Sequence, residues 1–386
     1  MNRGRTGRIA FGATIDYQLR YHDGLYQSLA DRGWEVHLIA SPGPIGARLG
    51  RHPGIVVHSL AMEREPNPGA DLLSLIRWIR VLHRISPDVV VVGTPKAGLL
   101  GGLAGWVLRV PRRIYELHGL RLESASGIFR KLLRFSERAS CAFSHEVVAV
   151  SESLRNVVID ERITSNEQVL VVGCGSPNGV DIEHFEDQSA DETAKEALRR
   201  QLRIDPDEKV VVFVGRLTAD KGVGALAEAI AEIDAADPVH LLAIGGIDGP
   251  SGVEGMAHLR RVVPRLTIVG EVDDVAPYLA IATLLCLPSR REGLPTVVLE
   301  AFAAGVPVVA TAATGVVDLV HDGKTGLLAP IDDAQALSRA LRRALDDPTI
   351  RSDFARESKE LVSREYAGDV VRARWVEFLL MGPDDS

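Results

Sequence analysis

Short apolar segments recur along the chain, separated by longer segments that mix apolar and polar residues at helical spacing. Residues 89–92 are all valine, and residues 210–214 are all valine but for one phenylalanine. Such runs are typical of strands buried on both faces of a parallel sheet. In residues 71–85, leucine and isoleucine fall on one side and arginine elsewhere, which predicts an amphipathic helix. The alternation of the two patterns predicts an α/β fold with parallel sheets.

The same two patterns place elements along the whole chain. We expect strands, some with their following loops, at residues 8–14, 35–40, 55–60, 89–92, 113–117, 147–151, 169–172, 209–214, 239–246, 266–269, 283–287 and 306–310. We expect helices at residues 18–32, 71–85, 127–143, 297–304, 333–346, 350–365 and 367–380. The polar residues 186–208 predict a linker and a surface helix.

One stretch organises the chain, a predicted strand–loop–helix–strand unit. The apolar run 283–287 predicts its first strand, and Pro295 suits the first position of a helix because the N–H it lacks would be unsatisfied there. The helix continues over 297–304, Gly305 ends it, and 306–310 form the next strand. The helix N-terminus therefore points out of the sheet, where it favours an anion.

Two carboxylates bracket this turn. Glu292 precedes the helix, and Glu300 lies roughly 7.5 Å further along its axis, at about 1.5 Å per residue. A ligand with an anionic centre and hydroxyl groups on both sides would fit, and a sugar nucleotide has that shape. The alternative is a solvated loop Glu and a surface helix Glu.

A second loop carries two cations. Arg216 and Lys221 flank the turn between the strand at 209–214 and the next helix. A departing nucleoside diphosphate develops negative charge, which preorganised cations stabilise. Strand–loop–helix turns also carry solvated cations, so this loop indicates a diphosphate site mainly in combination with Glu292 and Glu300.

These sequence motifs resemble those of a known protein family. The stretch 287–310 is similar to the Glu-x7-Glu motif of retaining glycosyltransferases with the GT-B fold, specifically the large family 4. Residues 94–98 and 117–119 resemble motifs of family members that build bacterial surface polysaccharides. Residues 178–181 resemble the family's turn at which the chain leaves the first domain. Residues 12–14 depart from the small-residue loop of the family, because they lack a Gly-Gly pair.

The resemblance implies two Rossmann-like domains with parallel sheets that face a central cleft. The acceptor-side domain would comprise residues 1–182, with a C-terminal helix at about 366–386 crossing back onto it. The domain that binds the nucleotide sugar would comprise residues 205–365.

The resemblance also implies a reaction, the retaining transfer of a hexosyl or N-acetylhexosaminyl group from a nucleotide sugar, expected to be a UDP-sugar, to a hydroxyl. Arg216 and Lys221 would hold the diphosphate, Glu292 the sugar hydroxyls and Glu300 the ribose, with His118 beside the donor sugar. The remaining residues assigned to the donor site are Gly215, Gly270, Glu271, Gly293, Leu294 and Thr296. No cofactor or metal is implied, because the cations and the helix N-terminus supply the positive charge.

Composition limits the number of domains, the cellular compartment and the kinds of partner to expect. The 386 residues suffice for two domains, and three dispersed cysteines give no disulfide framework or zinc site, so a reducing cytoplasm is the default expectation. We find neither a run of about 18 apolar residues, as a spanning helix requires, nor a signal-peptide pattern. Residues 1–180 hold 22 Lys and Arg against 16 Asp and Glu, whereas residues 181–386 hold 22 against 36. The acidic second half argues against nucleic acid as a partner.

The acceptor is a separate hypothesis. The basic first half suits phosphates or an anionic membrane surface, and together with the polysaccharide-type motifs it suggests a polyprenyl-diphosphate-linked saccharide at the membrane as the acceptor. The basic amphipathic segment 127–143 has a composition that can dock on an anionic membrane surface at the inner face, although a core-facing helix with a solvated basic side has the same pattern. A nonhydrolysing UDP-sugar 2-epimerase and a non-catalytic sugar-nucleotide-binding protein remain as alternatives to a transferase.

Overall fold

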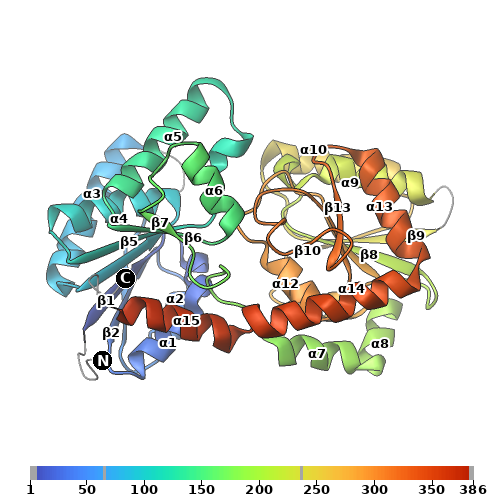
Figure 1. The fold of residues 1–386 in the computed structure, drawn as a ribbon, viewed down its shortest axis with the longest axis horizontal. Helices are drawn as coiled ribbons and strands as arrows, with labels where there is room; N and C mark the ends of the chain where they lie inside the picture. Colours follow the sequence, from blue (N-terminus) through green and yellow to red (C-terminus); the bar gives the residue numbers. More distant parts are fainter. Residues whose placement is uncertain (1–6, 64–66, 235–237, 382–386) are drawn as a thin grey trace. The chain divides into compact units, whose positions relative to one another are not determined.

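The computed structural model describes residues 7–63, 67–234 and 238–381, and the chain divides into two compact units. Unit 1 comprises residues 1–178 and 369–386, and unit 2 comprises residues 179–368. Each unit is an α/β layer structure built on its own parallel sheet, so the predicted fold class is confirmed (Figure 1). No helix among the described residues is long and apolar enough to span a bilayer.

Unit 1 is built on a seven-stranded sheet in the order β3-β2-β1-β4-β5-β6-β7, in which every neighbouring pair is parallel. Its strands are β1 (Arg8–Gly12), β2 (Glu35–Ala40), β3 (Ile55–Ser59), β4 (Val89–Gly93), β5 (Arg112–Leu117), β6 (Glu146–Ala149) and β7 (Val169–Leu170). The order reverses direction between β1 and β4, where the fold places ligand sites beyond the carboxyl ends of the strands.

The helices of unit 1 cover both faces of this sheet. They are the 3-10 helices η1 (Asp16–His22) and η2 (Arg121–Ser124) and the α-helices α1 (Asp23–Ala30), α2 (Pro44–Leu49), α3 (Pro68–Ile85), α4 (Pro95–Val107), α5 (Gly127–Ala142), α6 (Glu152–Asp160) and α15 (Gly368–Leu380), the last of which starts one residue before unit 1 resumes. The buried Trp375 of α15 packs in the unit 1 core, and its indole N–H donates to the carbonyl oxygen of Ser176 at 3.0 Å. The final helix is therefore part of the first core.

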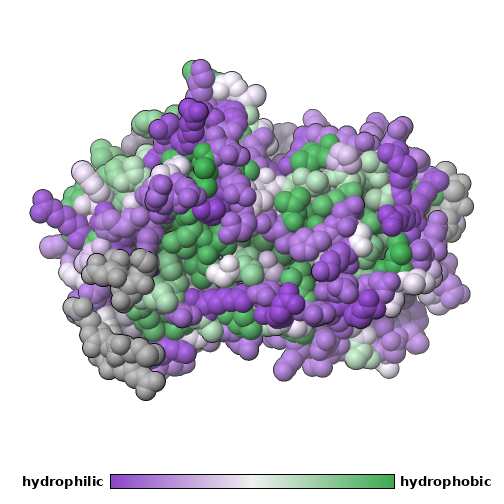
Figure 2. Space-filling model, viewed as in Figure 1, coloured by the Kyte–Doolittle hydropathy of each residue, from purple (hydrophilic) through white to green (hydrophobic). Residues whose placement is uncertain are grey.

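Unit 2 is built on a six-stranded parallel sheet in the order β10-β9-β8-β11-β12-β13. Its strands are β8 (Lys209–Val214), β9 (Val239–Ile244), β10 (Leu266–Gly270), β11 (Leu284–Leu287), β12 (Val308–Thr311) and β13 (Gly326–Ala329). Its helices are α7 (Ile182–Ala190), α8 (Glu192–Leu202), η3 (Ala219–Lys221), α9 (Val223–Asp234), α10 (Gly249–Val262), α11 (Ala276–Ala280), α12 (Thr296–Ala303), α13 (Ala334–Asp346), α14 (Pro348–Leu361) and η4 (Val362–Tyr366). The outward face of α14 is hydrophilic (Figure 2).

Several predicted elements differ from the observed ones. The single helix expected at 18–32 is a 3-10 helix followed by α1, and the Asp16 carboxylate ties the start of the 3-10 segment to α2 by accepting from the backbone N–H groups of Ile45 and Gly46. The surface helix expected within 186–208 is present as α8, but the linker expected beside it is shorter, because α7 occupies the residues up to Ala190; each helix is capped by an aspartate. Pro295 is the residue before α12 rather than its first residue, since its ψ of 105° is extended.

Candidate donor site

The site in unit 2 begins where two neighbouring strands end. β8 and β11 are adjacent and parallel, with Val211 opposite Leu284. Their following loops, 215–222 and 288–295, therefore leave the sheet at the same edge. These loops carry the two predicted cations and the first predicted glutamate.

Lys221 and Glu292 meet directly. The Lys221 ammonium donates to both carboxylate oxygens of Glu292, at 2.6 and 2.8 Å. The two side chains are only 19% and 12% exposed, and the buried Ser289 hydroxyl adds a hydrogen bond of 2.7 Å to Glu292 Oε1. Lys221 and Glu292 therefore form one largely buried ion pair rather than two solvated charges.

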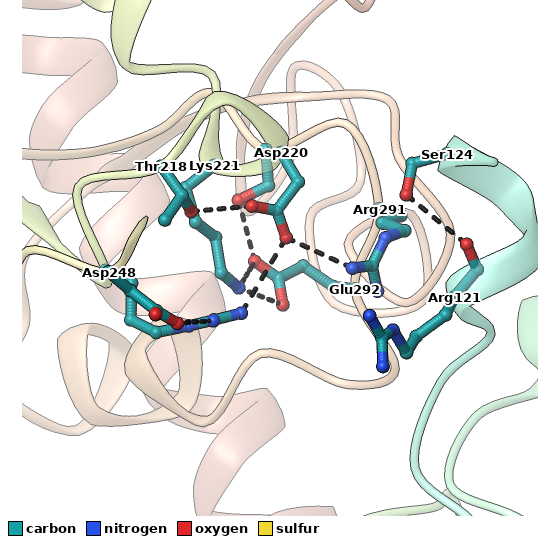
Figure 3. A network of polar contacts seen from close by, with 10 residues as sticks. Arg121, Ser124, Thr218, Asp220, Lys221, Asp248, Arg291 and Glu292 are labelled. Atoms are coloured by element: carbon teal, nitrogen blue, oxygen red, sulfur yellow. Dashed lines mark hydrogen bonds and ion pairs between the residues drawn. The ribbon is translucent and has the colours of Figure 1, made fainter. Parts of the chain in front are cut away.

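Asp220 joins the two loops (Figure 3). Its carboxylate accepts from the Thr218 hydroxyl at 2.6 Å and from Arg291 Nη2 at 3.1 Å, and Arg216 Nη2 lies 3.8 Å away. Partial burial alone would raise the pKa of Asp220, but the Thr218 hydrogen bond and the positive charges of Arg291 and Arg216 outweigh it and lower that pKa. The aspartate is therefore a fixed negative charge between cations from both loops.

Arg216 lies at the exposed side of this network. Its guanidinium pairs with Asp248 at 2.5 Å, and both side chains are 44% exposed. Arg216, Lys221 and Glu292 are thus gathered within one set of ion pairs, in which carboxylates balance each cation. An anionic ligand bound here would replace some of these carboxylates as the partner of the cations.

Glycine permits the close approach of the two loops. Gly222 has a φ of +71°, and a Cβ there would lie 1.8 Å from the carbonyl oxygen of Pro288. Only glycine adopts this backbone and this contact without strain. The neighbouring Gly215, at the end of β8, has a φ of +155°.

The other predicted donor-site residues are distributed around these loops. Gly293 and Leu294 follow Glu292 in its loop, and Thr296 begins α12, which carries the half-buried Glu300. Gly270 and Glu271 lie at the end of β10, and the Gly270 carbonyl accepts from the backbone N–H of Gly245 at 2.7 Å. That bond joins the end of β10 to the loop after β9.

His118 lies in unit 1, directly after β5. Its ring packs against that of Tyr21 with centroids 4.6 Å apart and planes tilted by 41°, and its Nε2 is 3.4 Å from Glu116 Oε2. These residues line a small pocket at the carboxyl ends of β1, β4 and β5. The pocket is bordered also by His22, Gly93 and Thr94.

Five residues of the unit 2 network were not predicted: Thr218, Asp220, Asp248, Ser289 and Arg291. Asp220 stands between Arg216 and Lys221 in the sequence, and Ser289 and Arg291 stand beside Glu292, so proximity to the predicted residues was an available signal. Nothing in the sequence links Asp248 to Arg216. Across the described ranges 7–63, 67–234 and 238–381, no group of three or more His, Cys, Asp or Glu side chains is placed to hold a metal ion.

Comparisons with known proteins identify the family to which the chain belongs. Residues 194–361 match the family model described as glycosyl transferases group 1, and residues 19–175 match the glycosyl transferase 4-like domain. The chain belongs to the group 1 glycosyltransferases of family 4 and has their GT-B fold.

Individual proteins resemble the chain over nearly its whole length. The capsular polysaccharide biosynthesis glycosyltransferase CapM of Staphylococcus aureus is 28% identical over 93% of both chains. An N,N'-diacetylbacillosaminyl-diphospho-undecaprenol alpha-1,3-N-acetylgalactosaminyltransferase of Campylobacter jejuni is 23% identical over 97% of both. The crystal structure of Anabaena HepE in complex with UDP and glucose superposes with a TM-score of 0.81, at 21% identity, over 97% of this chain and 99% of that one.

Proposed function

We propose that this chain transfers a hexosyl or N-acetylhexosaminyl group from a UDP-sugar to a hydroxyl of a saccharide acceptor, with retention of anomeric configuration. The observation that carries the proposal is the ion-pair network of unit 2, in which Arg216 and Lys221 lie at the carboxyl ends of adjacent strands together with Glu292. Ligands of open α/β sheets bind at that edge.

In this proposal the cations act on the leaving group. Arg216 and Lys221 hold the diphosphate and stabilise the negative charge that grows on it as the glycosidic bond breaks. Glu292, once released from Lys221, accepts hydrogen bonds from donor-sugar hydroxyls, and Glu300 accepts from the ribose. The departing phosphate oxygen takes the acceptor proton, so no protein base is assigned. The two cations and the α12 N-terminus supply the positive charge, and the proposed reaction uses no metal.

The relatives support the choice of substrates. The HepE structure contains UDP and glucose, which supports a UDP-linked donor. CapM is named for capsular polysaccharide biosynthesis, and the Campylobacter relative is named for a diphospho-undecaprenol acceptor. We therefore propose a role in surface polysaccharide or glycoconjugate biosynthesis, with a polyprenyl-diphosphate-linked saccharide as the acceptor class.

A nucleotide-sugar screen tests the proposed function. UDP-sugars should raise the thermal unfolding temperature, since a ligand at 100 times its Kd adds about 2.7 kcal/mol of stability. The stabilising donor should then yield a glycosylated product only when a saccharide acceptor is added, whereas an epimerase would convert the donor alone. Absence of stabilisation by every UDP-sugar, together with stabilisation by another nucleotide sugar, would contradict the choice of UDP.

Helix α5 offers a surface for the membrane contact that such an acceptor requires. Ile128, Leu132 and Phe135 share one side of α5 and are 86%, 60% and 72% exposed. Lys131 and Arg138 are exposed at the edge of the same side, whereas two other arginines of the helix pair with Glu161. An apolar stripe with adjacent cations suits an anionic lipid surface. We propose that this face of α5 contacts the membrane peripherally.

Co-sedimentation with vesicles tests this contact. The wild type should bind vesicles that contain phosphatidylglycerol at low salt and be released at high salt, because each basic residue near the surface contributes about 1 kcal/mol. Leu132→Glu should abolish binding. The matched control is Leu72→Glu on α3, where the native side chain is 59% exposed, and it should bind as the wild type does. Equal binding to neutral vesicles at any salt concentration would count against the proposal.

A further inference from the structure

A buried charged cluster lies in unit 1 behind His118. The Glu116 side chain, on β5, is 2% exposed, and its Oε2 atom is 2.6 Å from Nε2 of the buried His22. The same oxygen is 3.4 Å from Nε2 of His118. Both imidazole rings therefore face one carboxylate oxygen, although 94 residues separate His22 from Glu116 in the sequence.

Burying this ionised cluster costs folding free energy, so stability of the fold does not explain its presence. Burial would raise the pKa of Glu116, but the charges and hydrogen bonds of His22 and His118 outweigh it and hold that pKa far below its usual range. The carboxylate is therefore ionised in the interior, and among the described residues its Oε1 atom and Nδ1 of His22 have no hydrogen-bond partner. An apolar substitute of similar size often serves stability as well as a buried ion pair or better. The cluster thus calls for an explanation other than stability.

The surroundings of His118 suggest what the cluster does. The His118 ring is packed on Tyr21 on one side, and a Cβ at Gly93 would lie 2.9 Å from its Nε2. The Glu116 carboxylate contacts the same nitrogen from the side of the protein interior. His118 is 21% exposed and lines the pocket at the carboxyl ends of β1, β4 and β5. The ring is therefore fixed in place at the edge of this pocket.

We propose that Glu116, itself anchored by His22, is a positioning residue that fixes the orientation and the tautomer of His118. When the His118 ring is neutral, the Glu116 carboxylate favours the tautomer that carries its proton on Nε2, which leaves the Nδ1 lone pair to accept a hydrogen bond. His118 is then selective for a ligand group that donates, such as a sugar hydroxyl. This inference rests on the proposed role of His118 beside the donor sugar.

A double-mutant cycle distinguishes positioning from a structural role. Glu116→Gln keeps the size of the side chain and removes its charge, and it should lower kcat/KM about tenfold, the equivalent of one hydrogen bond to substrate. In a His118→Ala background the same change should have no further effect, because Glu116 acts through His118. Additive losses in the cycle would overturn the proposal. UDP affinity should be equal in all four proteins.

Glu137→Gln is the matched control. Among the described residues of unit 1, Glu137 is the other buried glutamate, and it accepts a hydrogen bond of 2.7 Å from Tyr115, the residue before Glu116 on β5. Consecutive strand residues face opposite sides of a sheet, so this control removes a buried carboxylate from the far side. Its kcat/KM should equal that of the wild type.

Nitrogen-15 NMR of the His118 ring tests the proposal without any transfer assay. In the wild type the neutral ring should carry its proton on Nε2, and in Glu116→Gln both tautomers should be populated. A wild-type ring protonated on Nδ1 would overturn the proposal, even if Glu116→Gln fails to fold. Loss of the proposed function would appear separately, as a wild type that neither binds a UDP-sugar nor transfers from it.

Discussion

Arg216→Ala is expected to lower the turnover number about a hundredfold, because loss of one preorganised group that stabilises charge in the transition state costs on the order of 3 kcal/mol. The variant should remain folded. Arg216 is 44% exposed and its ion pair with Asp248 lies at the surface, where such pairs contribute little to stability. The loss should therefore appear in steady-state kinetics with an unchanged thermal unfolding temperature.

Arg290→Ala is the control for this variant. Arg290 lies two residues before Glu292 and is 46% exposed, close to the value for Arg216, but its guanidinium pairs with Asp332 at 2.6 Å. It should retain wild-type turnover. Wild-type turnover in Arg216→Ala, or an equal loss in both variants, would remove the assignment of Arg216 to the diphosphate.

Glu137→Gln is expected to remove a large pH dependence from the stability of unit 1. Burial against β5 raises the pKa of Glu137 from 4.5 to about 7, and the hydrogen bond from Tyr115 offsets only part of this rise. A group whose pKa is raised in the folded state stabilises the protein fully below its unfolded pKa and loses that contribution as the pH rises through the folded value. At about 1.4 kcal/mol per pKa unit, the wild type should lose about 3 kcal/mol of stability between pH 4.5 and pH 8 that the variant keeps.

Tryptophan fluorescence during urea unfolding measures this difference. The chain has four tryptophans, and residues 34, 78, 106 and 375 all belong to unit 1, so the signal reports that unit. The difference in unfolding free energy between Glu137→Gln and the wild type should grow with pH across this window. Glu152→Gln, which removes a carboxylate that is 60% exposed on α6, should show no such growth. A difference independent of pH for Glu137→Gln would mean that the group ionises normally.

The sequence predicted most of the sheets because their strands are buried on both faces. Strands such as 35–40 and 209–214 have the predicted bounds, since a short, mostly apolar run suits a strand that is covered on both faces of a parallel sheet. The loop pair of unit 2 was also predictable, because the carboxyl ends of adjacent parallel strands meet at one edge. Helix α10 was not predicted, since glycines at 249, 252 and 255 lower its intrinsic propensity.

Contacts between distant side chains were beyond prediction. The sequence places His118 at the end of a strand, but the approach of His22 to Glu116 depends on how η1 and α1 pack against β5. Similarly, Asp248 reaches Arg216 only because the loop after β9 runs beside the loop after β8. Such pairings are set by tertiary packing, and neither composition nor periodicity encodes them.

The central claim is that the cations of the β8 loop hold the diphosphate of one nucleotide sugar, whose sugar hydroxyls bind the acid of the β11 loop. Calorimetric titration of UDP and of uridine into the wild type and into Arg216→Ala tests it most directly. We predict that UDP binds the wild type at least about tenfold more tightly than the variant, equivalent to about 1.4 kcal/mol, whereas uridine, which lacks phosphate, binds both equally. Equal UDP affinity in the two proteins would contradict the account.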